Sequence, residues 1–197
     1  MSITALTPGL RPGVLADRVP GAAMLGDALT IAAGAGATGL CAQIALLTPL
    51  SPVPFTLQTF AVLVVGAALG PMRGVAAMLL YVGVGTLGLP WFAGQSGGWH
   101  GHTFGYLLGS VLAAALVGES ARRGHDRSVG RTLAAMATGH AVIYAVGALW
   151  LSASLHVGLG QSLTQGVVPF LVTDSLKIAA AAGILPLVWR ILQRGGR

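Results

Sequence analysis

Six long apolar stretches constrain the fold of this sequence more than any other feature. They lie at about 25–47, 56–70, 74–90, 103–118, 132–155 and 166–192. A helix needs about 20 residues to cross a bilayer, with a usual range of about 17–25. The first, fifth and last stretches exceed that length, and the other three lie near its lower limit. The pattern predicts an all-α bundle of six transmembrane helices.

The overall composition favours the same fold class. Of the 197 residues, 54% are hydrophobic and 8% are charged, and the mean hydropathy is +0.80. A soluble domain carries roughly 25% charged residues. Too few charges remain to cover a water-facing surface. Because Cys41 is the single cysteine, the chain has no internal disulfide and no Cys-rich metal site, and we expect neither metal nor cofactor.

The positions of the basic residues predict the orientation of the helices. All ten arginines lie before the first stretch, after the second, after the fourth or in and after the last, at positions 11, 18, 73, 122, 123, 127, 131, 190, 194 and 197. The loops at 48–55, 91–102 and 156–165 contain no Lys or Arg. By the positive-inside rule, both termini are cytoplasmic. Arginines that alternate with membrane spans also argue against a nucleic-acid surface, despite the net charge of +6.

These boundaries divide the chain into three parts. We expect a cytoplasmic leader over residues 1–22, one integral-membrane domain over 23–193 and a cytoplasmic tail over 194–197. The leader is rich in Pro and Gly and lacks the charged start and short apolar core of a cleaved signal peptide.

Two charged residues, Asp174 and Lys177, lie inside the last apolar stretch. If this helix starts near Gly166, a rise of about 1.5 Å per residue places Asp174 roughly 12 Å deep. A spacing of three residues places both side chains on one face. A single charge at this depth costs about 2.5–3.5 kcal/mol, so the two should pair and face the protein interior. They form either a structural ion pair or, as we favour, the polar floor of a ligand site.

Two of the three outside loops carry features that could cover such a site. Three prolines make the 48–55 loop stiff and extended before Gln58. The 91–102 loop offers Trp91 and Phe92 as apolar faces, and glycines such as Gly97 allow close backbone approach. An interfacial aromatic belt is the alternative reading for its aromatic residues, above all for Trp99.

Two further groups of residues, one on the first helix and one on the fifth, can each be interpreted in two ways. Ala28, Ala32 and Gly36 place small residues on one face of the first helix, which suits either packing inside the bundle or docking of another membrane protein. His140 and Tyr144 share a face of the fifth helix. We interpret them first as hydrogen-bonded packing and second as lining of a pocket.

Three segments resemble the BioY family, the biotin-specific substrate-binding (S) components of energy-coupling-factor (ECF) transporters. They are SPVPFTLQTFAVLVVGAALGP at 51–71, LYVGVGTLGLPWFAGQSGG at 80–98 followed by GYLLG at 105–109, and PFLVTDSLKIAAA at 169–181. The resemblance covers roughly residues 25–190. The segment between Gly98 and Tyr106 is shorter than the usual family loop, and Thr173 stands where family members often have Gly.

The resemblance implies that the chain binds biotin from the outside and takes part in its uptake across the cytoplasmic membrane. Asp174 would accept from a ureido N–H, Lys177 would keep Asp174 ionised, and Gln58 would meet the carbonyl or the carboxylate. Four aromatic side chains would pack on the ring and the aliphatic chain: Phe55, Trp91, Phe92 and Tyr106. The partners implied are a membrane coupling (T) protein, docked on Ala28, Ala32 and Gly36, and a pair of cytoplasmic ATPases. The chain itself has no GxxxxGK[ST] motif and cannot be the ATPase.

Two alternatives differ in class. Gly94-Gln95-Ser96-Gly97 matches the GxSG of rhomboid intramembrane serine proteases, but a serine nucleophile needs a nearby base, and the last helix contains no His. A transporter or S component for another small vitamin would share the same topology and the same polar pair.

Overall fold

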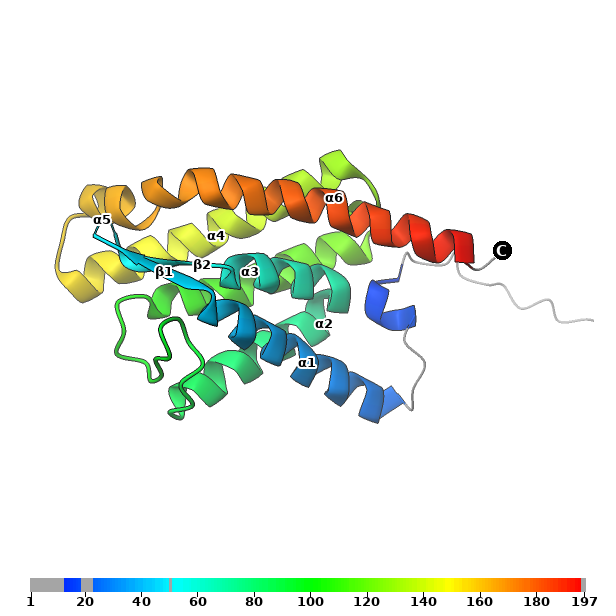
Figure 1. The fold of residues 1–197 in the computed structure, drawn as a ribbon, viewed down its shortest axis with the longest axis horizontal. Coiled ribbons are helices and arrows are strands. Elements are labelled where there is room, and N and C mark those ends of the chain that lie inside the picture. The colour runs from blue at the N-terminus through cyan, green and yellow to red at the C-terminus, as the bar shows by residue number, and fades with distance from the viewer. Residues whose placement is uncertain (1–12, 19–22, 50, 196–197) are drawn as a thin grey trace, which may run out of the picture.

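The computed structural model describes residues 13–18, 23–49 and 51–195 as an elongated helical bundle (Figure 1). The long elements are α1 (Ala23–Gln43), β1 (Ala45–Thr48), β2 (Ser51–Thr56), α2 (Gln58–Thr86), α3 (Phe104–Arg122), α4 (Val129–Leu155), α5 (Leu159–Gly166) and α6 (Leu171–Gly195). Three short 3-10 helices join them, namely η1 (Leu15–Arg18), η2 (His125–Arg127) and η3 (Val168–Phe170). Most of the predicted leader lies outside the described residues, as do the last two residues of the tail.

Five helical elements of the described chain are long and apolar enough to cross a membrane. This confirms a multi-pass helical fold but differs from the predicted six helices. The difference arises at α2, where the second and third predicted helices join into one assigned element. Gly70 lies within it at φ 82° and ψ −179°, which is not helical, and Pro71 follows.

The break at Gly70 reverses the direction of the chain. A Cβ placed on Gly74 would lie 3.1 Å from the Cα of Gly66. In a straight helix, residues eight apart are about 12 Å apart. The segments 58–69 and 71–86 therefore fold back against each other. A positive φ is cheap only for glycine, so the residue type at position 70 explains the location of the turn.

The structure corrects the first and last predicted helices. The first ends at Gln43, and residues 45–48 form β1 instead of the helical end predicted to reach 47. The 48–55 segment, expected to be an extended loop, supplies β2, which pairs antiparallel with β1 through Leu46 and Phe55. The last helix begins at Leu171 rather than near Gly166, because α5 and η3 occupy 159–170.

Small residues bring the helices close together in the core. A Cβ on Gly66 would lie 2.9 Å from the backbone of Ala114, and one on Gly109 would lie 2.9 Å from the Cα of Ile143. Such contacts allow α2, α3 and α4 to pack with their backbones near one another. The largest fully buried side chain is Tyr81, which lies with Met78 on the inner face of α2.

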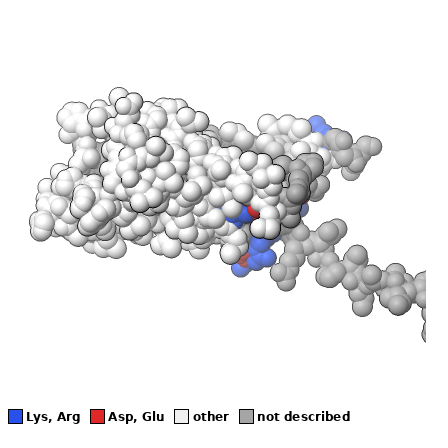
Figure 2. Space-filling model, turned by 90° about the horizontal axis from the view of Figure 1, so that it is seen from below, with Lys and Arg blue, Asp and Glu red and all other residues white. Residues whose placement is uncertain are grey.

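Charged side chains gather at one end of the molecule. On the face shown in Figure 2, all coloured Lys, Arg, Asp and Glu atoms lie toward the end from which the grey segments extend, and the rest of the described surface on that face is white. Arg73 pairs with Asp17 and Asp27 at 2.7 Å each, while Glu119 pairs with Arg122 at 2.6 Å. The hairpin β1–β2, α5 and the 87–103 segment lie at the opposite end (Figure 1). An apolar flank between two polar ends is typical of a protein that spans a bilayer.

Candidate functional site

Asp174 and Lys177 form a buried ion pair between α6 and the start of α2. Lys177 Nζ donates to Asp174 Oδ1 at 2.6 Å, to the Thr56 carbonyl at 2.6 Å and to Thr59 Oγ1 at 3.2 Å. An ammonium has three N–H donors, and here each has an acceptor. Asp174 is only 3% exposed. The predicted pairing on one helix face is therefore confirmed.

The position of the pair within α6 differs from the prediction. Asp174 lies in the first turn of α6, three residues after its start at Leu171. The carboxylate is therefore about 5 Å, not 12 Å, from the beginning of that helix. It is nevertheless buried, and β2, η3 and the 87–103 segment line the cavity beside it.

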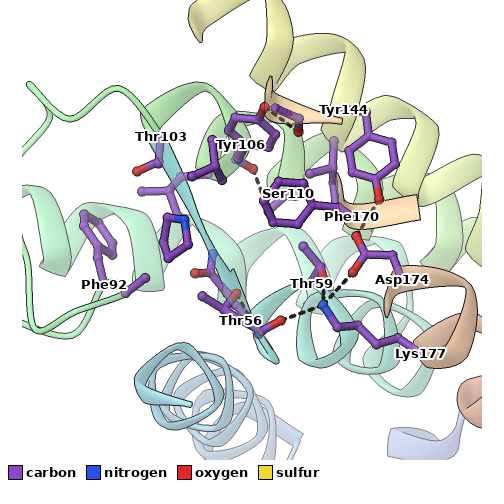
Figure 3. A pocket seen from close by; sticks show the side chains of 17 residues that line it. Thr56, Thr59, Phe92, Thr103, Tyr106, Ser110, Tyr144, Phe170, Asp174 and Lys177 are labelled. Carbon is purple, nitrogen blue, oxygen red and sulfur yellow. Dashed lines mark hydrogen bonds and ion pairs between the residues drawn. The ribbon is translucent and has the colours of Figure 1, made fainter. Parts of the chain in front are cut away.

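Two side chains of α4 approach the second oxygen of Asp174. Tyr144 Oη donates to Oδ2 at 2.6 Å, and His140 Nε2 lies 3.5 Å from the same oxygen. Figure 3 shows Tyr144 and Lys177 directed at the carboxylate from opposite sides. Tyr144 therefore lines the site, the reading that we ranked second from the sequence.

A cavity adjoins this pair on the side of the hairpin (Figure 3). Seventeen residues from eight parts of the fold line it: Val53, Pro54, Thr56, Gln58, Thr59, Phe92, Ala93, Thr103, Tyr106, Leu107, Ser110, Ile143, Tyr144, Gly166, Phe170, Asp174 and Lys177. Nine of these side chains are apolar or aromatic. Of the polar ones, Thr56 and Thr59 reach Asp174 through Lys177, whereas Thr103 lies on the opposite side of the cavity (Figure 3). Concave, mainly apolar cavities with a few placed polar groups are the usual form of small-molecule sites.

Five of the eight residues predicted to contact a ligand line this cavity: Asp174, Lys177, Gln58, Phe92 and Tyr106. Tyr106 Oη donates to the Gly166 carbonyl at 2.9 Å, which fixes its ring beside the cavity. Phe92 is 5% exposed and packs edge-on against Tyr81.

The other three predicted residues lie outside the cavity lining. The ring of Phe55 stacks on that of Phe170 at 4.3 Å and thus supports the wall from behind. Trp91 Nε1 donates to the Tyr81 carbonyl at 2.9 Å, which directs this indole toward α2. Gly97 packs against the carbonyls of Gly85 and Leu89, so its small size serves the loop itself.

Sequence reasoning missed Thr59, Ser110 and the Thr56 carbonyl. A backbone carbonyl has no sequence signature, and threonines and serines are common in membrane helices. The segment Thr56-Leu57-Gln58-Thr59 did contain a usable signal, since a Thr one turn after the start of a helix could face the same side as Thr56.

A family comparison identifies the class of protein that carries this site. The model of the BioY family matches residues 16–194, nearly the whole chain. The chain belongs to the BioY family.

Relatives of this BioY-family chain show similarity across most of their length. It is 38% identical over 147 residues to the probable biotin transporter BioY of Pyrococcus horikoshii, covering 73% of this chain and 84% of that one. It is 39% identical over 137 residues to the biotin transporter BioY of Thermotoga maritima, covering 68% and 79%. A crystal structure described as the S-component for biotin from an ECF-type ABC transporter matches with a TM-score of 0.76 at 21% identity, over 87% of this chain and 95% of that one. This last likeness is one of fold.

Membership of a transporter family, together with the geometry of the loop, shows that the protease alternative is wrong. Ser96 is exposed, and its Oγ donates to the Ala93 carbonyl at 2.9 Å within its own loop. His140 is 3% exposed and lies beside Asp174, inside the bundle. Among the described residues, Ser96 Oγ therefore has no hydrogen bond to a His base, which a serine nucleophile requires.

The small face of α1 does not serve packing inside this chain. Ala28 and Ala32 are exposed, and a Cβ on Gly36 would meet nothing within 4 Å. The contact of α1 with α2 uses another face, where a Cβ on Gly34 would lie 2.9 Å from Val65. Of the two readings, packing within the described bundle is therefore wrong, and docking stays a prediction.

Proposed function

We propose that this BioY-family chain binds biotin from the outside of the cell and takes part in its uptake across the cytoplasmic membrane, as the substrate-specific component of an ECF-type transporter. The names of the relatives and the shared fold support this substrate and this role. The observation within the chain that carries the proposal is the buried carboxylate of Asp174 at the polar end of an apolar cavity.

The chemistry of biotin suits this arrangement. A ureido ring offers two N–H donors and one carbonyl acceptor. Asp174, which is paired with Lys177, can accept from an N–H, and a hydrogen bond to a charged group is stronger than one between neutral groups. Gln58 can serve the ureido carbonyl or the carboxylate tail. Phe92, Tyr106 and Phe170 offer apolar surface to the sulfur ring and the aliphatic chain.

Equilibrium binding to the purified chain tests the proposal. We expect biotin and desthiobiotin, which share the ureido ring, to bind tightly. Lipoic acid has a sulfur ring and the same type of carboxylate tail but no ureido N–H, so it should bind at least about 100-fold more weakly, because the buried acceptor on Asp174 would be left unpaired. Tight binding of thiamine or riboflavin instead of biotin would assign the site to another vitamin.

The proposed role includes a topology of six crossings with both termini in the cytoplasm. The fold-back at Gly70 gives 58–69 and 71–86 opposite directions, as two successive crossings require. The arginines of the described chain lie at the element ends away from the cavity. A membrane coupling protein and a pair of cytoplasmic ATPases would supply the energy for transport.

Cysteine labelling in intact cells tests this topology. In a Cys41→Ser background, we expect an impermeant maleimide to label Trp99→Cys, whose parent side chain is 55% exposed in the 87–103 segment. Arg194→Cys should be labelled only after the membrane is opened. Labelling of Arg194→Cys from outside would contradict the orientation.

A further inference from the structure

His140 is a buried ionisable side chain that the proposed site does not use. Its side chain is 4% exposed, and its Nε2 atom has no hydrogen-bond partner among the described residues. The other ring nitrogen, Nδ1, lies 3.2 Å from the carbonyl of Met136 on the preceding turn of α4. Buried polar atoms are rarely left without a partner, so the environment of Nε2 requires an explanation.

The bond at Nδ1 determines what Nε2 presents to Asp174. A carbonyl can only accept, so Nδ1 carries the hydrogen in this contact. In neutral His140, Nε2 then has no hydrogen and carries a lone pair. This acceptor atom faces another acceptor, Asp174 Oδ2, at 3.5 Å. In protonated His140, the same atom donates toward the carboxylate. A short movement of either side chain would close this gap to a hydrogen bond.

The charges in the cavity indicate when a proton on His140 Nε2 would be favourable. Asp174 and Lys177 together are neutral, and no other Lys or Arg lines the cavity among the described residues. A ligand with an ionised carboxylate adds one negative charge to this mainly apolar space. A buried charge without compensation is costly. Among the groups that contact the ion pair, His140 can supply the missing positive charge.

The other ionisable groups around His140 either belong to the site or lie at the far end of the bundle. On its own helix lies Tyr144, on α6 lie Asp174 and Lys177, and on α3 Tyr106 faces the cavity. The remaining charged residues on the neighbouring elements lie near the cytoplasmic ends. Arg73 pairs with Asp17 and Asp27, and Glu119 pairs with Arg122 and Arg123. Asp126, which accepts from Trp189, belongs with His125 and Arg127 to η2, Arg131 lies in the first turn of α4, and Arg190 and Arg194 lie in the last two turns of α6. Asp126 is 14 residues before His140, and most of that distance is helical. These groups therefore leave His140 as the proton acceptor of the site.

We propose that the protein takes up one proton on His140 Nε2 when it binds its anionic ligand, and that the resulting cation holds Asp174 in its binding orientation. The proton comes from the surrounding water. With it, the carboxylate of Asp174 and that of the ligand balance Lys177 and His140. The inference rests on the proposed function and adds a regulation by pH to the same site. His140 acts through Asp174 and is therefore a positioning residue.

Calorimetric titration of the full-length protein with biotin tests the proposal. Titration at one pH in two buffers of different ionisation enthalpy measures the protons taken up, and we expect close to one per biotin at pH 8. The affinity should fall as pH rises from 6 to 8.5, by up to tenfold per pH unit, because the proton must be taken from an ever lower concentration. Biotinamide, which is neutral, should bind without proton uptake.

Two sets of variants locate the proton. His140→Asn and His140→Gln should bind biotin with no dependence on pH in this range. The matched control is His100→Asn with His102→Asn, which removes the two exposed histidines of the outer loop and should keep the wild-type pH dependence. If the His140 variants bind too weakly to measure, nitrogen-15 spectra of the wild type with labelled histidine give the same answer. Biotin should then convert one histidine from the neutral to the doubly protonated pattern.

The failures can be told apart. Biotin binding that is independent of pH in the wild type, or equally dependent on pH in the His140 variants, would overturn the proton proposal and leave the proposed function intact. Equal proton uptake with biotinamide would also overturn it, because the ligand charge would then play no part. No binding of biotin at any pH would refute the proposed function and this inference with it.

Discussion

Asp174 and Lys177 form an ion pair inside the bundle in which each side chain has more than one partner. Lys177 has three acceptors, and Asp174 receives Tyr144 Oη on the oxygen that Lys177 does not use. A buried ion pair repays its desolvation only when its remaining hydrogen-bonding positions are filled. This network therefore fixes the carboxylate in one orientation, next to the cavity.

Replacing the carboxylate tests its role in binding. Asp174→Asn keeps the shape of the side chain, and Lys177 keeps the Thr56 carbonyl and Thr59. We expect the variant to fold with a lowered melting temperature and to bind biotin about 10- to 150-fold more weakly, since a hydrogen bond to a charged group contributes about 1.5–3 kcal/mol. Equilibrium binding and thermal unfolding in detergent measure both effects.

The neighbouring position supplies a control for this variant. Ser175 is exposed on the same turn of α6 and donates to the Leu171 carbonyl. Ser175→Asn should bind biotin like the wild type. Unchanged affinity in Asp174→Asn would refute the assignment of Asp174 to the ligand.

At the scale of elements, the turn at Gly70 is the feature that other helices depend on. Its backbone approaches α3 so closely that a Cβ on Gly118 would lie 2.6 Å from Gly70 C and from Pro71 N. Backbone atoms cannot move aside as a side chain can. The pairing of α2 with α3 therefore requires glycine at position 118.

A methyl group at this contact should destabilise the bundle. Gly118→Ala should lower the free energy of unfolding by about 1–3 kcal/mol, the usual cost of overpacking. Gly83→Ala, on the second half of α2 where a Cβ would meet nothing within 4 Å, should be neutral or stabilising by up to about 1 kcal/mol. Equal melting temperatures for the two variants would contradict the close approach of Gly118 to the backbone of Gly70.

At the scale of the whole molecule, the cavity and the arginines of the described chain lie at opposite ends, and α1 leaves a small-residue face uncovered. Ala28 and Ala32 are exposed on that face. Small residues allow another helix to approach closely in lipid. This face therefore suits a coupling protein without any contact with the cavity.

Bulky side chains on this face should separate transport from binding. Ala28→Leu and Ala32→Leu should impair uptake of labelled biotin in cells that express the coupling proteins, and the purified variants should bind biotin normally. Ala137→Leu, at an exposed position on α4, is the matched control and should transport normally. Normal uptake in both α1 variants would refute docking on this face.

Much of this architecture follows from local properties of the chain. Runs of apolar residues must form helices in a bilayer, because every backbone polar group needs an internal partner there. The spacing of Asp174 and Lys177 already implied a pair on one helix face, and the three quoted segments already resembled the BioY family. None of these inferences required knowledge of how distant segments meet.

The features that depend on contacts between distant segments were decided only by the tertiary structure. The PVPFT segment became a strand only because residues 45–48 were available to pair with it, and the last helix began five residues late because α5 and η3 pack over the site. The cavity brings α2, α3, α4 and α6 together with β2, and its lining depends on side-chain directions across all of them. Phe55 and Trp91 point to other neighbours for the same reason. Composition and spacing act along the chain, whereas a binding site is formed between segments that the chain separates.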